Sequence, residues 1–354
     1  MILVDGSMLE GGGQILRMAI SYSAVLGEPV RIVNIRVGRS PPGLRPQHLT
    51  TLKAVKEICD GEAEGLSAGS MDVTFRPGRP KGGSYSFDIG TAGSISLLLQ
   101  CIAPIASFAD SPTEIRIRGG TAVRWSPPIR ILRSVVWEAY TGMGFTGRLE
   151  VRREGFYPRG GGLVDVSVKP VVELSSLRTE PVDGTPGVEG ASVCGRLPRH
   201  VAERQARSAE RVLEGAGVDS EISIVVAEGD IAPLSPGSVL SLWAVLSPKV
   251  FVGASALGER GKPAERVGEE AANSLVDELR VEASVDQHTA DNLILWCSLA
   301  GGESSFTTST LTRHTRTAIE MARLFTGVEF AVDVESKGRT RISCEGIGLK
   351  NRWV

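Results

Sequence analysis

Apolar and polar residues follow one another along this chain in patterns that predict helices and short strands in turn. Residues 305–325, SFTTSTLTRHTRTAIEMARLF, begin with Ser, Thr and Phe, which favour a strand, and end with apolar side chains at helical spacing. Helical spacing also marks residues 46–58 (PQHLTTLKAVKEI) and 127–140 (PPIRILRSVVWEAY), each in a proline-containing context. The pattern therefore predicts a mixed α/β (α+β) fold.

Two long segments repeat the same order of elements about 80 residues apart. One begins at Glu10 and the other at Ile89, and each predicts a Gly-rich loop, an amphipathic helix, a strand that ends at a glycine and a second helix. A third copy occupies residues 285–325. We expect one large domain of three two-helix/β-sheet units around a pseudo-threefold axis.

The third copy lies about 110 residues further along the chain than this period predicts, so an insertion must separate it from the second. Residues 179–190 (TEPVDGTPGVEG) are rich in turn-forming residues. The pattern then predicts four further elements, which are a helix at 200–217, strands at 221–229 and 238–245, and a helix at 264–279. We therefore expect a three-repeat domain at 1–180 and 281–354, with a small inserted α/β domain at 181–280.

Composition narrows the class of protein. With a net charge of −2, the chain is unlike a polybasic nucleic-acid binder, but 31 of its 39 cationic side chains are arginines, which bind phosphate through paired hydrogen bonds. The five cysteines lie far apart without a CxxC pair, which argues against a zinc site or a disulfide framework. No apolar run is long enough to cross a bilayer and the first residues lack a signal-peptide pattern, so we expect a cytosolic protein.

The predicted helix starts of the three repeats are candidate anion sites, because unpaired backbone N–H groups point out of a helix N-terminus. These starts follow Gly11–Gly13 and Gly90–Gly93 in the first two repeats, and coincide with HTADN at residue 288 in the third. None matches a P-loop or a GxGxxG pattern, and the chain has no Lys-x-Asp-Gly motif that would supply a lysine nucleophile. Nucleotide chemistry would need another nucleophile here.

Polar residues concentrate around these junctions. The stretch IRVGRSPPGLRPQH carries Arg36, Arg39 and Arg45 on a loop rich in Pro and Gly, which suits a chain of phosphates. Arg17 follows Glu10 by seven residues, a spacing that places both side chains on one face of a helix. A solvated arginine cluster is the alternative interpretation of the loop.

The four histidines differ in what their surroundings predict. His48 opens a helix, where capping or packing explains it, and His200 is expected on the surface of the insert. His288 and Asp291 share a face of a first helical turn, which suits a nucleotide, a metal ion or a capping role. His314 lies between the predicted strand and helix, either as a turn residue or as a nucleophile whose imidazole attacks phosphorus to form a phosphoramidate.

Several motifs occur in an order that identifies a family, namely EGGGQILR, RxGRxxPGLxxQHLT, FRPG, GTAGS...LLLQ, GFYPRGGG, DQHTADNLIL and HTRTAIE. They span nearly the whole chain, most weakly in the insert, and the sequence resembles the RNA 3'-terminal phosphate cyclases. The resemblance implies three repeats like the C-terminal domain of translation initiation factor three and an inserted α/β domain. It also implies a fold related to the enolpyruvyl-shikimate-phosphate synthases.

The activity that the resemblance implies is the ATP-dependent conversion of an RNA 3'-phosphate to a 2',3'-cyclic phosphate, with Mg²⁺ or Mn²⁺. Enzyme–AMP and RNA-adenylate intermediates are implied, with His314 as the nucleophile. The other catalytic residues implied are Glu10, Arg17, Arg36, Arg39 and Gln47, and Glu10 is also the implied metal ligand. The nucleotide contacts implied are Gln100, His288, Thr289, Ala290, Asp291 and Asn292.

The chain departs from this family at two places. Ala122-Val123-Arg124 follows GGT where an acidic residue is usual, and Asp291-Asn292 stands where the family usually has Asp-Gln. Neither change removes a residue that the resemblance assigns to catalysis. Two other functions stay open, a non-catalytic ribosome-assembly relative that lacks the histidine and a small-molecule transferase of the enolpyruvyl type. Oligomeric state is also open, with a homodimer as one option.

Overall fold

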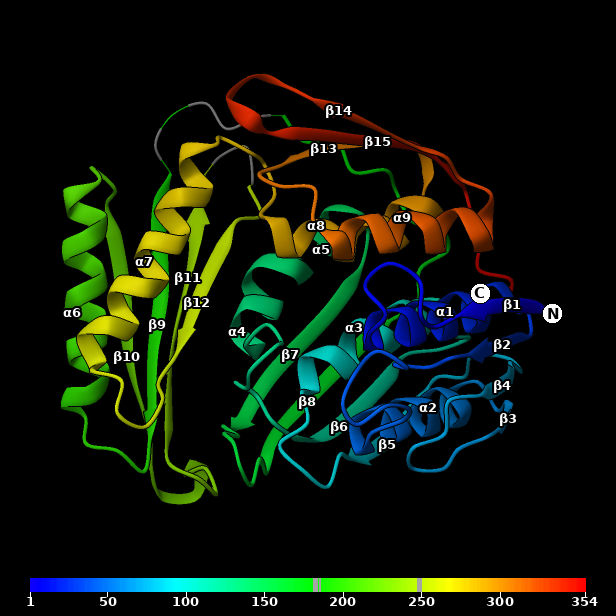
Figure 1. Ribbon diagram of the computed structural model, residues 1–354, viewed down its shortest axis with the longest axis horizontal. Helices are drawn as coiled ribbons and strands as arrows, with labels where there is room; N and C mark the ends of the chain where they lie inside the picture. The colour runs from blue at the N-terminus through cyan, green and yellow to red at the C-terminus, as the bar shows by residue number, and fades with distance from the viewer. Residues whose placement is uncertain (181–183, 185, 247–249) are drawn as a thin grey trace.

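The computed structural model describes residues 1–180, 184, 186–246 and 250–354. Within these residues the chain forms helices and four small sheets, which confirms a mixed α/β fold (Figure 1). One sheet with two helices lies at one side of the molecule, and the other three sheets with their helices form the larger body. We call this larger part the body and residues 187–280 the insert.

In the first unit of the body, α2 has the bounds that the sequence predicts. Its elements are β1 (Ile2–Asp5), α1 (Gly13–Leu26), β2 (Val30–Val33), α2 (Pro46–Ile58), β3 (Glu62–Glu64) and β4 (Val73–Arg76). Gly27 ends α1 in the left-handed conformation (φ 77°), which costs a glycine little, and Pro46 begins α2 with its φ already helical. The strand order is β1-β2-β4-β3, with β1 parallel to β2 and the other pairs antiparallel.

The second unit has the same connectivity. Its elements are β5 (Gly83–Asp88), α3 (Ile95–Ser107), β6 (Thr113–Gly119), α4 (Ile129–Ile131), α5 (Trp137–Gly142), β7 (Thr146–Arg153) and β8 (Gly162–Lys169). The order β5-β6-β8-β7 again starts with a parallel pair followed by antiparallel pairs. Buried and exposed residues alternate strictly along β6, as a strand with one face on the core requires. The helix predicted at 127–140 forms with a π-helical segment at Leu132–Val136.

The third unit confirms the strand and helix predicted around His314. Its elements are α8 (Gln287–Leu299), β13 (Gly301–Thr308), α9 (Arg313–Thr326), β14 (Phe330–Val334) and β15 (Thr340–Ile347), with strand order β13-β15-β14. A single parallel bridge joins Val285 to Thr308, at the position where the other two units have their first strand. The likeness of these units to an initiation-factor domain stays a prediction.

The insert builds its own sheet. Its elements are β9 (Gly187–Gly195), α6 (His200–Gly215), β10 (Ser220–Ala227), β11 (Gly237–Val245), β12 (Gly253–Leu257) and α7 (Ala264–Arg280). The order is β10-β9-β11-β12, and α6 and α7 pack together on one face (Figure 1). Both helices and strands β10 and β11 confirm the sequence pattern, whereas β9 and β12 were not predicted. The predicted boundary at residue 181 and part of the turn-rich entry lie outside the described residues.

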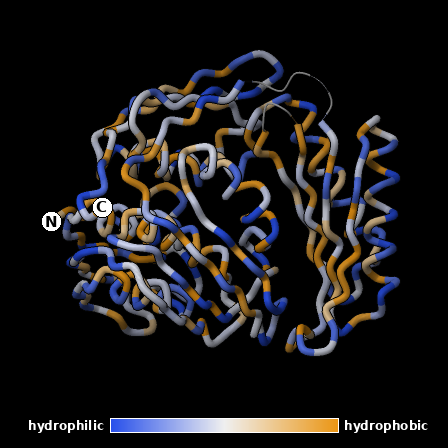
Figure 2. Tube along the Cα trace, turned by 180° about the vertical axis from the view of Figure 1, so that it is seen from behind, coloured by the Kyte–Doolittle hydropathy of each residue, from blue (hydrophilic) through white to orange (hydrophobic). Residues whose placement is uncertain are grey.

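The main core lies between the sheets of the body, where α1, α3 and α8 contribute buried side chains such as Ile15, Leu99 and Trp296. Each such side chain stabilises the fold by about 1.5–3 kcal/mol. Trp296 stacks on Tyr140 with ring centroids 4.2 Å apart, which joins α8 to α5. Figure 2 shows the apolar positions recurring along the inner strands and helices, with polar positions on the outer helix of the insert. The described part of the chain contains no helix apolar and long enough to cross a membrane.

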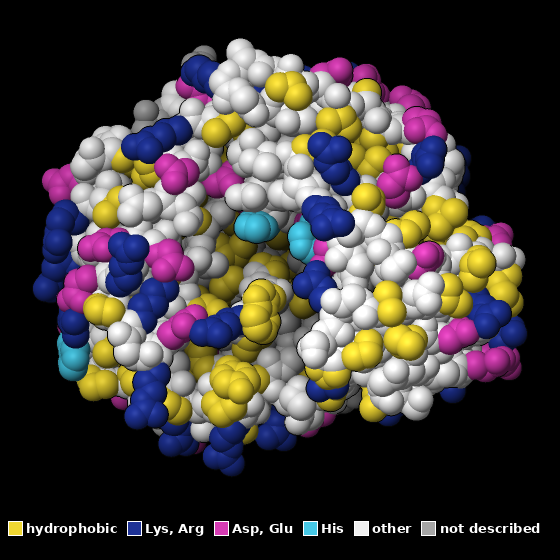
Figure 3. Space-filling view, in the orientation of Figure 1, with side chains coloured by type: hydrophobic (Ala, Val, Ile, Leu, Met, Phe, Trp, Pro, Cys, Tyr) yellow, Lys and Arg dark blue, Asp and Glu magenta, His cyan; other side chains and the backbone are white. Residues whose placement is uncertain are grey.

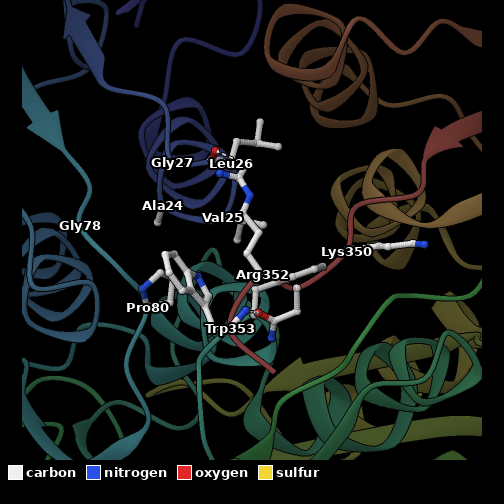
Figure 4. Close-up of a pocket in the computed structure, with 11 residues that line it drawn as sticks. Ala24, Val25, Leu26, Gly27, Gly78, Pro80, Lys350, Arg352 and Trp353 are labelled. Atoms are coloured by element: carbon white, nitrogen blue, oxygen red, sulfur yellow. Dashed lines mark hydrogen bonds between the residues drawn. The ribbon is translucent and has the colours of Figure 1, made fainter.

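The C-terminal tail lines a pocket together with the end of α1 and the segment around Gly78 and Pro80 (Figure 4). Arg352 donates a hydrogen bond to the carbonyl of Leu26 at 3.3 Å, and Trp353 lies under the Arg79 guanidinium, 4.8 Å from its ring centroid. The Asn351 amide donates to the carbonyl of Ala109 at 2.9 Å. The tail therefore ties α1 of the first unit to the end of α3 in the second.

Candidate active site

Segments far apart in the sequence meet in one hollow of the body, where histidine side chains lie near arginines and an acidic group (Figure 3). The start of α1 supplies Gln14, the start of α8 supplies Asp291, and the start of α9 supplies His314. Hydrogen bonds from Gln14 join all three segments. The fold thus gathers the beginnings of three helices at one place.

His314 is the second residue of α9, whose first turn is held by Thr312 as its N-cap. The Gln14 Nε2 group lies 3.2 Å from both an Asp291 carboxylate oxygen and the His314 carbonyl, so it donates to them. The Gln14 Oε1 atom therefore faces His314 Nδ1 at 2.9 Å and accepts a hydrogen bond from its N–H. This fixes the neutral ring with a proton on Nδ1 and leaves a lone pair on Nε2.

The charge state of His314 favours that lone pair. Burial lowers the pKa of His314, and the nearby carboxylate of Glu10 opposes this shift only in part. Arg17 and Arg39 lower the pKa further because a second positive charge beside them is unfavourable. The ring is therefore neutral and nucleophilic at neutral pH.

Burial also shifts the pKa of Asp291, a residue of α8 that accepts a hydrogen bond from Gln14. The pKa of Asp291 is raised from 3.8 to about 7 by burial, with Arg17 acting in the opposite direction. A negative charge on Asp291 would stabilise positive charge on His314 through the amide of Gln14. Asp291, Gln14 and His314 therefore form one polar chain.

Glu10 does not share a helical face with Arg17, as the seven-residue spacing predicted, because α1 begins only at Gly13. Glu10 lies in the turn before the helix, its backbone N–H donating to Thr317 of α9 at 3.3 Å. One carboxylate oxygen pairs with Arg39. The other, Oε2, is buried and has no hydrogen-bond partner within the described part of the chain. An acidic oxygen in this condition suits a cation supplied from outside.

Two glycines make room for this arrangement. A Cβ atom on Gly12 would collide with the carboxylate of Glu10, and one on Gly13 would lie 2.6 Å from His48 Nε2 and 2.9 Å from an Arg17 nitrogen. Gly12 is also the N-cap of α1 and has no side chain to bond the first N–H groups. The start of α1 is therefore open to an anion.

The other two predicted anion sites are occupied by the chain itself. At the start of α3, Ser94 accepts a hydrogen bond from the Leu97 N–H at 3.2 Å. At the start of α8, the Asp286 carboxylate accepts from the N–H groups of His288 and Thr289, both at 2.8 Å. A capping carboxylate repels anions, so the expectation of an anion site at the start of α8 was wrong.

Among the three arginines of the loop before α2, Arg39 pairs with Glu10, whereas Arg36 and Arg45 form no ion pair within the described residues. Burial lowers the pKa of Arg36, and the charges of Arg45 and Arg39 lower it further. The Arg36 guanidinium donates to the carbonyls of Pro41 and Gly43 at 3.0 and 2.8 Å, so it also shapes the loop. Mutual repulsion of this kind is relieved by a polyanion, which is what the loop is suited to hold.

His48 belongs to this cluster although its sequence context indicated only capping or packing. It does cap α2, since its Nδ1 accepts the Arg45 N–H at 3.1 Å. Burial lowers its pKa to about 3, with Arg17 and Arg36 acting in the same direction. The neutral ring then carries its proton on Nε2, which faces Gly13 at the start of α1. Gln14 was missed entirely, because only the tertiary fold brings it to His314.

The remaining predicted site residues differ in burial and in their hydrogen-bond partners. Gln47 accepts the Ser94 N–H at 2.9 Å and so joins the first unit to the second beside the cluster. His288 is exposed, and Asn292 donates to the His288 carbonyl at 2.7 Å, near Asp291. Thr289, whose hydroxyl donates to Asp286, and Ala290 are both buried. Gln100 is half-buried on α3 and forms no hydrogen bond with the cluster among the described residues.

No group of three or more His, Cys, Asp or Glu side chains within the described ranges is arranged to hold a metal ion. The five cysteines are buried and none of them forms a disulfide. A divalent cation at this site would therefore bind through Glu10 together with oxygen atoms of a ligand, which is how Mg²⁺ is commonly held.

The sequence of this chain is similar to a described family and to several known proteins. The sequence model of a family described as "RNA 3'-terminal phosphate cyclase" matches residues 8–332. A protein of that name from Pyrobaculum aerophilum is 45% identical over 347 residues, covering 98% of this chain and 99% of the relative. Proteins of the same name from Methanopyrus kandleri and Pyrococcus furiosus are 46% and 43% identical, covering 96% and 97% of this chain and 96% and 98% of the relatives.

Proposed function

This chain belongs to the RNA 3'-terminal phosphate cyclase family, and from that premise we propose that it converts an RNA 3'-phosphate to a 2',3'-cyclic phosphate at the expense of ATP. The observation that supports this most directly is the neutral imidazole of His314. Its Nδ1–H is held by Gln14 and its Nε2 lone pair is available beside an arginine cluster. A nucleophile of this kind is what an enzyme–AMP intermediate requires.

In the first step, Nε2 of His314 attacks the α-phosphorus of ATP, an N–P bond forms, and pyrophosphate leaves. The imidazole ring becomes positively charged because Nδ1 keeps its proton. The Oε1 atom of Gln14 accepts a stronger hydrogen bond from that ring, and Asp291 lies behind the amide to balance the charge. The polar chain thus stabilises the adduct more than the free enzyme.

Positive groups around His314 would hold the phosphates. Arg17, Arg36, Arg39 and Arg45 surround the open start of α1, and His48 offers an Nε2–H donor there. Glu10 would hold Mg²⁺ or Mn²⁺, which would offset phosphate charge. Arg39 keeps the carboxylate of Glu10 in place. We assign nucleotide contacts to Gln100, His288, Asp291 and Asn292, with Thr289 and Ala290 supporting that helix turn from the interior.

The second and third steps follow from the chemistry of the adduct. An oxygen of the RNA 3'-phosphate attacks the phosphorus of AMP, the N–P bond breaks, and His314 returns to its neutral state. The oxygen of the neighbouring 2'-hydroxyl then bonds to the activated 3'-phosphorus, the phosphoanhydride bond to AMP breaks and the hydroxyl proton is released to solvent, giving the cyclic phosphate and AMP. Both attacks need the RNA end fixed beside His314, a role that we give to Gln47 and the arginines.

Further parts of this proposal concern architecture. We propose that residues 1–180 and 281–354 form the catalytic domain and that 181–280 form an inserted domain. The shared connectivity of the first two sheets, and the bridge between Val285 and Thr308 in the third, support three copies of one unit. We also place the protein in the cytosol, where RNA ends and ATP occur together.

The experiment that tests this function presents three oligonucleotides that differ only in their last nucleotide. With ATP and Mg²⁺, an RNA 3'-phosphate should give a cyclic phosphate, and a DNA 3'-phosphate should stop at the adenylated end because it lacks the 2'-hydroxyl. An RNA 3'-hydroxyl should not react. Label from α-labelled ATP should stay on the denatured wild-type protein and be absent from His314→Ala. Equal reaction of the 3'-hydroxyl and 3'-phosphate RNAs would reject the proposal, as would label on another residue.

A further inference from the structure

Two aromatic side chains on loops of the body are strongly exposed to solvent. Trp125 is 92% exposed and Tyr157 is 77% exposed, whereas Trp137 and Trp296 are almost completely buried. Exposing two large rings forfeits the stabilisation that burial would give. Such exposure is typical of a surface that meets a partner.

The two rings stand on neighbouring closed loops. The loop that carries Trp125 is closed by a hydrogen bond from the Ile129 N–H to the Thr121 carbonyl at 2.8 Å. The turn that carries Tyr157 is closed by the Gly160 N–H and the Phe156 carbonyl, also at 2.8 Å. A bridge between Ala122 and Phe156 joins the two loops. The backbones under both rings are therefore fixed relative to each other.

Trp125 has an unusual backbone conformation, with φ at +61°. A residue with a Cβ atom adopts this left-handed region at a cost, and it does so where the surrounding structure requires it. Here the Ser126 hydroxyl holds the loop by donating to the Val123 carbonyl at 3.1 Å. The ring is thus presented in advance of binding, so a partner would lose less entropy in ordering it.

The turn that carries Tyr157 packs against the loop that leads into α3. Gly160 packs so closely on the loop before α3 that a Cβ atom would lie 2.7 Å from the Thr91 carbonyl oxygen and 2.8 Å from the Ala92 Cα. The same loop continues to Ser94, which donates its N–H to Gln47. One glycine-rich loop therefore separates the turn of Tyr157 from the residues around His314.

The charge around the rings also suits a nucleic acid. Arg124 precedes Trp125 and pairs with Glu259 of the insert at 2.5 and 3.1 Å. That carboxylate raises the pKa of Arg124, and the Tyr157 hydroxyl acts in the same direction from close by. Arg159 is exposed on the Tyr157 turn, and its backbone N–H donates to Ser235 of the insert at 3.2 Å. Two arginines thus flank the two rings where the body meets the insert.

We propose that Trp125 and Tyr157 form a stacking platform for the bases that precede the 3'-phosphate of the RNA substrate. The proposal rests on the proposed function, which requires the 3'-phosphate to enter the hollow while the rest of the strand leaves it. Every base has a flat face that stacks on an aromatic ring, so such a platform would hold the strand without reading its sequence. Arg159 would contact the backbone phosphates beside it, while Arg124 stays paired with Glu259 and holds the Trp125 loop against the insert.

The test compares Trp125→Leu, Tyr157→Leu and the double variant with the wild type. Binding of a fluorescent oligoribonucleotide 3'-phosphate is measured by anisotropy without ATP. Loss of one stacked base should raise the dissociation constant about five- to a hundredfold, and Trp125→Phe should keep most of the affinity. The matched control is Trp353→Leu, which alters an exposed aromatic side chain on the C-terminal tail and should leave binding unchanged.

Two further readouts separate the alternatives. Formation of enzyme–AMP without RNA and turnover of a mononucleoside 3'-phosphate should be unaffected in the variants, because neither uses the preceding bases. Unchanged RNA affinity in the double variant overturns the platform. A matching loss of enzyme–AMP formation also overturns it, because the rings would then hold the adenine of ATP. Wild-type protein that binds RNA through these rings without cyclising it would reject the proposed function and leave the platform standing.

Discussion

Replacing Gln14 with methionine tests the idea that a hydrogen bond sets the tautomer of His314. The change keeps the length and volume of a buried side chain, so the packing of α1 should survive. It removes the acceptor that faces His314 Nδ1 and the donor that serves Asp291. The imidazole can then rotate, or carry its proton on Nε2 and hide the lone pair that attacks ATP.

The size of the effect follows from these contacts. One hydrogen bond lost from a neutral group is worth about 0.5–1.5 kcal/mol, and a buried group left unsatisfied costs about 1–3 kcal/mol. If about 1.4–2.8 kcal/mol of this acts only in the transition state, formation of enzyme–AMP slows ten- to a hundredfold. The ATP concentration at half-maximal rate should stay nearly the same, because the substitution alters the tautomer and orientation of His314 and leaves the phosphate contacts in place.

The assay is single-turnover transfer of label from α-labelled ATP to protein, with thermal unfolding measured in parallel. The control is Gln205→Met in the insert, where a buried glutamine accepts from Ser192 at 3.0 Å and donates to Ser238 at 2.8 Å. Both variants should lose stability, and only Gln14→Met should lose adenylation. Wild-type adenylation in Gln14→Met would refute the tautomer argument. Equal slowing in both variants would show general destabilisation instead.

Three other changes give measurable outcomes. Arg39→Ala should slow enzyme–AMP formation about ten- to a hundredfold because it removes a charged phosphate contact and frees Glu10. Arg31→Ala, which removes an arginine of similar exposure paired with the exposed Asp72, should not slow it, and equal rates in the two variants would mean that the loop cluster is only solvated. The folded-state pKa of Asp291, raised to about 7 from 3.8, means that this carboxyl destabilises the fold increasingly as pH rises through that window. The unfolding free energy of Asp291→Asn should therefore exceed that of the wild type by more at pH 7 than at pH 4, and a pH-independent difference in denaturant unfolding would contradict this. A short linker in place of 181–280 should leave a folded body, destabilised by about 3–5 kcal/mol through loss of the core side chain Phe251, and a product without cooperative unfolding would refute the domain boundary.

Sequence patterns predicted most accurately the helices that have one buried and one solvated face. The bounds of α2 and the positions of α6, α7 and α9 follow directly from helical spacing. Strands β9 and β12 were not predicted, because their sequences, GVEGASVCG and GASAL, consist mainly of small residues and show no clear alternation of polar and apolar positions. Such strands form because neighbouring strands and helices cover them, which is information that a local pattern does not contain.

The sequence alone singled out His314 and the loop arginines as candidate site residues, because their side chains have a distinctive chemistry and an unusual local context. It was not predictable where only contacts decide the role. In the sequence, Gln14 is only a polar residue in a mainly apolar helix. Its role depends on its contact with His314 of α9, which lies 300 residues further along the chain. The start of α8 looked open to anions, and the preceding Asp286 closes it. Glu10 was expected on a helix face, but the glycines after it delay the helix.

The carboxylate of Asp286 has a consequence for anyone who exchanges modules between members of this family. It holds the first turn of α8, and it also accepts the N–H of Gly253 in the insert at 3.1 Å. Gly253 further packs against Val135 without room for a Cβ atom. A transplanted insert must therefore bring a glycine with a free N–H in the same register, or the graft will shift the helix that carries Asp291. The two parts are separate in topology and interdependent as engineering units.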